Sequence, residues 1–317
     1  MIRQCSSIGI EDSIRRRHSE RIHAASESLR LIESSKYGSI DSDTQEDKPT
    51  RSISISEKII EEGKILKDEL AAMISLSIPV IATYILEIIP SLITIFLVGR
   101  MDSDNSKLYL DAAALGVMLY NIVGLSTGLG LLTALDTLCA SAHGANENSK
   151  MGRYLLTGIA IMTIVFMITG SVLLNTTSVL LVFKQPQEVA YYAGEFTLYM
   201  LPGLPCLYAY ELLRKLSQAR NDTAPMVVAA IMSVIVNYAV GYYLVNVCDW
   251  WLGAAVARTL GAAVLFPILF IGMLITDREF LVEVWTGCEI KEAITIKQMK
   301  KFLSLGVPGM LQVMFEW

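Results

Sequence analysis

Six long apolar runs follow one another between Leu70 and Thr276, and a seventh begins near Phe302. A helix that crosses the hydrocarbon core of a bilayer needs about 20 apolar residues, and the first six runs all reach that length. A water-soluble domain has no means of burying so much apolar helix. The sequence therefore predicts an all-α polytopic membrane protein. Because the chain ends at Trp317, inside the seventh run, we expect it to be truncated there.

Prolines divide or bend two of the expected spans. The spans are expected at residues 70–98, 111–135, 153–174, 190–213, 225–247, 251–275 and from 302 onward. Pro79 and Pro90 predict a kink or tilt in the first span, because each proline removes one backbone hydrogen bond. Pro202 and Pro205 predict a hinge in the fourth span, since moving helices of transporters are often interrupted in this way.

The first 68 residues differ in composition from the rest. They are rich in Ser, Arg and Glu with little apolar periodicity, which predicts a disordered tail. Residues 56–70 alternate charged and apolar positions and are a candidate for an interfacial amphipathic helix. The net charge of -5 averages this tail with an apolar body, so it gives no indication of a charged partner such as nucleic acid.

Lys and Arg residues are distributed unequally between alternate loops. Fourteen lie on one set of flanks: Arg51, Lys58, Lys64, Lys67, Lys150, Arg153, Arg214, Lys215, Arg220, Arg278, Lys291, Lys297, Lys300 and Lys301. Only Arg100, Lys107 and Lys184 lie on the other set. Since basic residues favour cytoplasmic loops, we expect a cytoplasmic N-terminus.

Charged residues inside the predicted spans are candidates for a functional site, because a charge in the bilayer is costly unless it pairs or meets water. Glu87 lies in the first span, Arg258 in the sixth and Glu195 in the fourth. We expect Glu87 and Arg258 to pair across a cavity, with Glu195 as a further member. Tyr84 is an additional cavity candidate.

Other polar residues have simpler interpretations. We expect Asn121 and Asn237 either to line the cavity or to hydrogen-bond between helices. Asp136 and Glu211 lie near the inner ends of their spans, which favours helix caps or local hydrogen bonds. The five cysteines are isolated and match no metal-ligand spacing. The sequence therefore predicts a protein that has no metal site, binds no cofactor and is not an enzyme.

Five motifs resemble the multidrug and toxic compound extrusion (MATE) family in its eukaryotic branch. They are residues 134–145, Leu201-Pro202-x-Leu204-Pro205 followed by Arg214, Gln218 and Pro225, Asn237, residues 253–257, and Gly306-Val307-Pro308 followed by Phe315-Glu316-Trp317. The resemblance covers residues 69–317. The chain departs from the family at Ser141 and His143, at Glu87, where relatives often carry Gln, and at Arg258, which replaces a neutral residue.

MATE transporters have twelve helices in two six-helix lobes. The resemblance implies a disordered cytoplasmic tail at 1–68, the six-helix N-lobe at 69–276, a cytoplasmic inter-lobe loop at 277–300 and the start of helix seven at 301–317. It also implies a secondary active antiporter that exports organic solutes or xenobiotics in exchange for protons, with sodium as the less favoured ion. Glu316 falls on the family's glutamate of helix seven and would carry the coupling proton. Because the second lobe supplies half of the cavity, we expect this chain alone to be inactive.

Two alternative functions stay open. A lipid-linked oligosaccharide flippase belongs to the same superfamily, and second-lobe sequence would distinguish it. A seven-helix receptor fits the number of spans, but the third span lacks an acidic–arginine pair at its inner end. In the favoured interpretation the protein is a monomer in the plasma membrane or in a vacuolar or other endomembrane, and its partners are an organic small molecule, protons and lipid.

Overall fold

The computed structural model describes residues 55–101, 105–220, 222–276, 278–286 and 293–316. The side chains of Glu316 and of several residues before Val80 are outside this description. Every regular element among the described residues is a helix. Residues 63–317 form one compact unit, and residues 55–62 of the unit before it are helical. The expected disorder of the tail concerns residues 1–54, which lie outside the described residues, and it stays a prediction.

Five helical segments are long and apolar enough to cross a membrane: Val80–Gly99, Ser106–Gly144, Asn148–Leu174, Ala224–Val247 and Gly253–Thr276. The first belongs to α2 (Ile55–Gly99), the third is α5 (Asn148–Leu174) and the fifth is α10 (Gly253–Thr276). The second consists of α3 (Ser106–Leu119), η1 (Tyr120–Ser126) and α4 (Thr127–Gly144). The fourth consists of α9 (Ala224–Tyr242) and η2 (Tyr243–Val247). The first, second, third, fifth and sixth predicted spans are therefore confirmed. The helix of α2 is continuous from residue 55 to 99, so the segment 56–70 is part of it, and its place on a membrane surface stays a prediction.

The fourth span is divided into two shorter helices. The helix α7 (Gln187–Met200) ends and α8 (Gly203–Ala219) begins on either side of Leu201 and Pro202. A proline has no N–H to donate to the preceding turn, and Pro202 and Pro205 together leave two carbonyls of this span without their usual donors. The break is thus a direct consequence of the two prolines. Three further helices are α6 (Thr176–Val182), α11 (Arg278–Thr286) and α13 (Ile296–Glu316).

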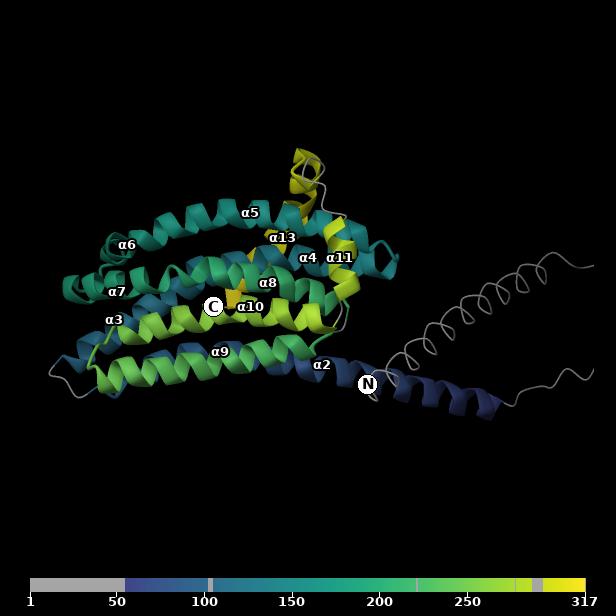
Figure 1. Cartoon of the computed structure of the whole chain (residues 1–317), viewed down its shortest axis with the longest axis horizontal. Coiled ribbons are helices and arrows are strands. Elements are labelled where there is room, and N and C mark those ends of the chain that lie inside the picture. The colour runs from purple at the N-terminus through teal and green to yellow at the C-terminus, as the bar shows by residue number, and fades with distance from the viewer. Residues whose placement is uncertain (1–54, 102–104, 221, 277, 287–292, 317) are drawn as a thin grey trace, which may run out of the picture. The chain divides into compact units, whose positions relative to one another are not determined.

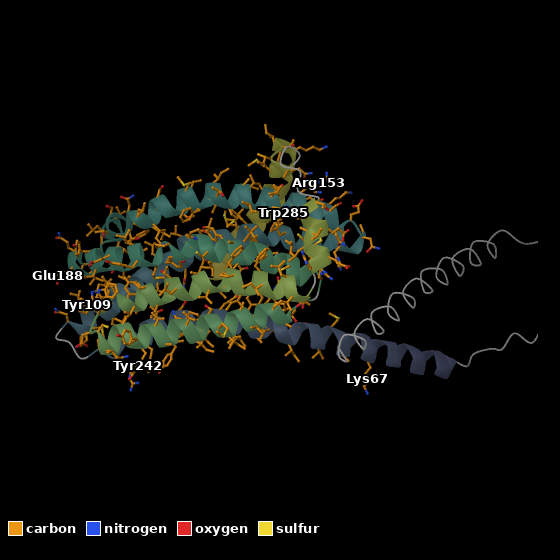
Figure 2. The ribbon with its side chains drawn as sticks, in the orientation of Figure 1. Lys67, Tyr109, Arg153, Glu188, Tyr242 and Trp285 are labelled. Carbon is orange, nitrogen blue, oxygen red and sulfur yellow. The ribbon has the colours of Figure 1, made fainter. Side chains whose placement is uncertain are left out.

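The long helices pack side by side along a common direction (Figure 1). The helix α10 packs against α9 and α8, α3 packs against α7, and α4 contacts α5, α8 and α13. Tyr109, Glu188 and Tyr242 lie near one end of this bundle, and Arg153 and Trp285 lie near the other (Figure 2). All five residues lie in helices, namely α3, α7, α9, α5 and α11 in that order.

The outer surface of the bundle is apolar. On α2 the exposed apolar residues recur every three or four positions: Ile78, Ile81, Ile85, Ile88, Leu92 and Phe96. This spacing places them on one face of the helix. An exposed apolar stripe of this length suits a hydrocarbon environment, as expected of a membrane-spanning helix.

Glycines allow α13 to pack closely against the backbone of α4. A Cβ on Gly306 would lie 2.7 Å from the carbonyl oxygen of Leu131, and one on Gly309 would lie 2.9 Å from the carbonyl oxygen of Gly130. On the α4 side, a Cβ on Gly130 would lie 2.9 Å from the backbone nitrogen of Met310. The two helices therefore meet backbone to backbone, the kind of close approach that small residues permit in membranes.

Candidate functional site

A cavity of about 630 Å³ lies among the helices of the bundle. Residues of α2, η1, α4, α7, α8, α9, α10 and α13 line it, and its walls are largely apolar. The apolar lining includes Leu86, Leu125, Leu129, Met200, Leu207, Ala262, Leu265 and Val313. The charged lining residues are Glu87, Asp136, Glu211, Lys215 and Arg258. A large apolar cavity with a few convergent polar groups is typical of a small-molecule site.

One buried arginine binds two of the cavity's carboxylates. Arg214 on α8 is fully buried, and its Nη1 lies 2.6 Å from Glu87 Oε1 and 2.7 Å from Glu211 Oε1. The ring of Tyr84 lies 4.4 Å from the Arg214 guanidinium carbon. Tyr210 Oη donates a weaker hydrogen bond of 3.4 Å to the same Glu87 oxygen. The network ties α8 to α2 and fixes the Glu87 side chain in place.

This network leaves polar atoms over. Glu211 Oε2 and the Nε and Nη2 atoms of Arg214 are buried and have no hydrogen-bond partner among the described residues. Two carboxylates share a single guanidinium, so the group of Glu87, Glu211 and Arg214 carries a formal charge of about -1 if all three are ionised. The acid-rich end of the cavity, which is lined by Glu87 and Glu211, therefore carries an excess of negative charge.

A second ion pair lies close by on α8. Lys215 Nζ donates to Asp136 Oδ2 on α4 at 2.8 Å. The expectation of a cap or local hydrogen bond is wrong for Asp136, because its partner is 79 positions away. The same expectation is confirmed for Glu211, which bonds Arg214 three residues later on its own helix. Arg214 and Lys215, expected on the inner flanks of the spans, are both buried in the bundle.

Arg258 contacts neutral groups. Its Nη1 donates to Ser91 Oγ at 2.5 Å and its Nη2 donates to Asn121 Oδ1 at 3.0 Å. The ring of Tyr120 lies 5.4 Å from its guanidinium carbon. The expected pair between Glu87 and Arg258 is therefore wrong. Ser91 follows Glu87 by one helical turn, so Arg258 reaches α2 one turn beyond the carboxylate.

A segment of π-helix presents two of these partners. Tyr120 and Asn121 are the first residues of η1, which interrupts the helix formed by α3 and α4. Inside η1 the backbone hydrogen bonds join residues five positions apart, as in a π-helix. Ser126 Oγ donates to the Asn121 carbonyl at 3.0 Å. Tyr208 Oη donates to the Gly124 carbonyl at 2.7 Å. Short π-helical segments are frequent at functional sites, and here one presents both residues to Arg258.

The other predicted site residues are distributed unevenly. Tyr84 lines the cavity, whereas Glu195 and Asn237 do not. Asn237 is buried, and neither its Oδ1 nor its Nδ2 has a partner among the described residues. Glu316 is the last residue of α13, and its side chain lies outside the described residues. The sequence pattern does not predict the contacts of Ser91, Tyr120, Tyr210 and Arg214. For Arg214 the available signal is its place only three residues after Glu211.

A family model described as MatE matches residues 79–243, which is just over half of the 317 residues. The chain belongs to the MatE family. The matched range contains Glu87, Asp136 and Arg214, while Arg258 and Glu316 lie beyond it. Membership in MatE makes this a multi-pass membrane protein and rules out the seven-helix receptor.

Curated relatives and solved structures agree with the MatE assignment. Multidrug and toxin extrusion protein 2 of Oryctolagus cuniculus is 29% identical over 251 residues, which cover 79% of this chain and 40% of the relative. Multidrug and toxin extrusion protein 1 of Xenopus tropicalis is 28% identical over 250 residues, 78% of this chain and 42% of the relative. The eukaryotic MATE transporter AtDTX14 matches in structure with a TM-score of 0.62 and 25% identity, over 74% of this chain and 50% of that one. The chain thus spans about two fifths of these curated relatives and about half of that transporter.

Proposed function

We propose that this MatE chain provides the first lobe of a secondary active efflux transporter, which exports organic solutes in exchange for protons. The observation that carries the proposal is the cavity of about 630 Å³, apolar on most of its walls and furnished with buried charges. Its volume falls within the roughly 300–1,000 Å³ typical of small-molecule sites. The names of the relatives, multidrug and toxin extrusion proteins, agree with this role.

The break between α7 and α8 is proposed as the hinge of alternating access. Met200 and Leu207, on either side of the break, both line the cavity. Thr259 Oγ1 on α10 donates to the Tyr199 carbonyl at 2.7 Å. Tyr199 is the second-last residue of α7. A bend at Pro202 and Pro205 would therefore change the cavity wall and the contact with α10 together.

Glu316 is proposed as the residue that carries the coupling proton. It follows Val313 by three positions on α13, and Val313 lines the cavity. Positions three apart share one face of a helix, so the geometry of α13 supports a place for residue 316 on the cavity side. The same proposal includes a cytoplasmic N-terminus and a monomeric state. It places the protein in the plasma membrane or in a vacuolar or other endomembrane.

Transport is tested on this chain extended by second-lobe sequence, because the relatives are longer than the chain. The protein is reconstituted in proteoliposomes, and export of a fluorescent organic solute is driven by a pH gradient. We expect Glu316→Gln to abolish gradient-driven export and to leave solute binding intact, since binding and coupling are separable steps. The control is Glu188→Gln, an exposed glutamate near one end of the bundle. Normal gradient-driven export by Glu316→Gln would overturn the coupling role, and absence of export by the unmodified protein would overturn the transporter itself.

A further inference from the structure

Arg258 differs from the other charged residues that line the cavity. Glu87 and Glu211 both bind Arg214, and Asp136 binds Lys215, at distances between 2.6 and 2.8 Å. Among the side chains that the structure describes, no carboxylate forms an ion pair with Arg258. Its two hydrogen bonds go to the hydroxyl of Ser91 and the amide oxygen of Asn121, both neutral.

An arginine in this position is prepared to bind an anion. The guanidinium carries five N–H donors in a planar fork that matches a carboxylate or sulfonate. Ser91 and Asn121 each take one donor and hold the side chain in the cavity wall. Tyr120 lies 5.4 Å from the guanidinium carbon and restricts the side chain further. A charge-assisted hydrogen bond to this fork would compensate a buried cation that neutral groups satisfy only in part.

From this arrangement we propose that the cavity selects organic anions, with the carboxylate or sulfonate of the solute bound by Arg258. The inference rests on the proposed function, because it names the substrate class of the same cavity. Leu125, Leu129 and Leu265 line the cavity as well and offer apolar surface to the rest of the solute. The favoured solute is therefore an aromatic or aliphatic body that ends in one anionic group.

The acid-rich end of the cavity does not oppose this assignment. Ser91 is four residues after Glu87, which corresponds to about 6 Å along the helix axis. Glu87 Oε1 accepts hydrogen bonds from Arg214 and Tyr210, so the excess negative charge belongs to the Arg214 network and does not lie beside Arg258. Counting Glu87, Glu211 and Asp136 against Arg214, Lys215 and Arg258 gives three acids and three bases, and Arg258 is the base that has no acid beside it.

The test measures binding to the full 317-residue chain in lipid nanodiscs. Three probes of nearly equal size are compared: 2-naphthoate, its neutral amide, and the cationic 2-naphthylmethylammonium. We expect the chain to bind the anion about tenfold more tightly than the amide, and the cation more weakly than either. Arg258→Gln should remove the preference for the anion and leave affinity for the amide unchanged. Arg100→Gln, which removes an exposed arginine outside the cavity, should retain the preference.

The outcomes separate this inference from the function on which it rests. Equal affinity for the three probes, or tighter binding of the cation, overturns the anion site while the cavity remains a solute site. Failure of all three probes to bind overturns the proposed cavity function itself. If Arg258→Gln fails to fold, Arg258→Lys decides, because it keeps the positive charge and removes the planar fork. We expect a folded Arg258→Lys protein to bind the anion less tightly and the amide unchanged, and an anion preference equal to that of the unmodified chain would overturn the proposal.

Discussion

Arg214 Nη1 on α8 lies 2.6 Å from Glu87 Oε1 on α2, and this ion pair joins positions 127 residues apart. Removal of one member of a buried pair leaves the other charge uncompensated, which costs roughly 3–5 kcal/mol. We predict a loss of that size for Arg214→Met. The triple change Glu87→Gln, Glu211→Gln and Arg214→Met should be milder, because no charge of the network remains. Thermal unfolding in detergent, followed by intrinsic fluorescence, measures both.

A double-mutant cycle distinguishes the observed pair from the one that sequence analysis expected. Glu87→Gln combined with Arg214→Gln should show a coupling free energy of about 0.5–3 kcal/mol. Glu87→Gln combined with Arg258→Gln should show a smaller coupling free energy, because the two residues do not form an ion pair. A larger coupling in the second cycle than in the first would contradict the observed pairing.

Asn237 and Asn121 should respond oppositely to the same substitution. Both amide atoms of Asn237 are buried without partners, and an unsatisfied buried polar group costs about 1–3 kcal/mol. We predict that Asn237→Leu keeps or raises the melting temperature. Asn121→Leu should lower it, since Asn121 accepts a hydrogen bond from Arg258. Equal losses in the two variants would show that Asn237 has a partner after all.

The contact between α4 and α13 can be tested with one methyl group. A Cβ on Gly306 meets the Leu131 carbonyl oxygen at 2.7 Å, whereas a Cβ on Gly144 meets nothing within 4 Å. We predict that Gly306→Ala is destabilised by about 1–3 kcal/mol, as in other overpacked sites. Gly144→Ala is the matched control and should be neutral or slightly stabilised, because alanine loses less backbone entropy on folding. Two equally stable variants would mean that α13 lies farther from α4.

Topology is tested by cysteine labelling in sealed vesicles after replacement of the exposed Cys248. The distribution of basic residues predicts that Glu188→Cys reacts with an impermeant reagent from outside and that Lys297→Cys does not. Glu188 serves as the outer probe, since it is exposed and lies near one end of the bundle. The reverse labelling pattern would place the N-terminus outside the cytoplasm.

The spans were predictable from sequence and the contacts in the cavity were not. Hydropathy and length fix where a helix crosses the bilayer, and five of the expected spans coincide with apolar helices of the structure. Contacts depend on the rotation of each helix and on the turn at which it meets its neighbour. An error of one helical turn in the position where Arg258 meets α2 was enough to predict Glu87 as its partner, whereas the structure shows Ser91. Arg214 and Lys215 were misplaced for another reason: counted as loop charges, they were never considered as partners inside the bundle.

The backbone contact between α4 and α13 restricts how the seventh helix can move. Rotation of α13 about its own axis would turn a side chain toward the Leu131 carbonyl, where a single Cβ on Gly306 already has no room. The glycine face therefore fixes which side of α13 meets α4, and Val313 on α13 lines the same cavity as Leu129 and Thr133 on α4. We expect any movement of α13 to act on the cavity directly, because Val313 forms part of the cavity lining.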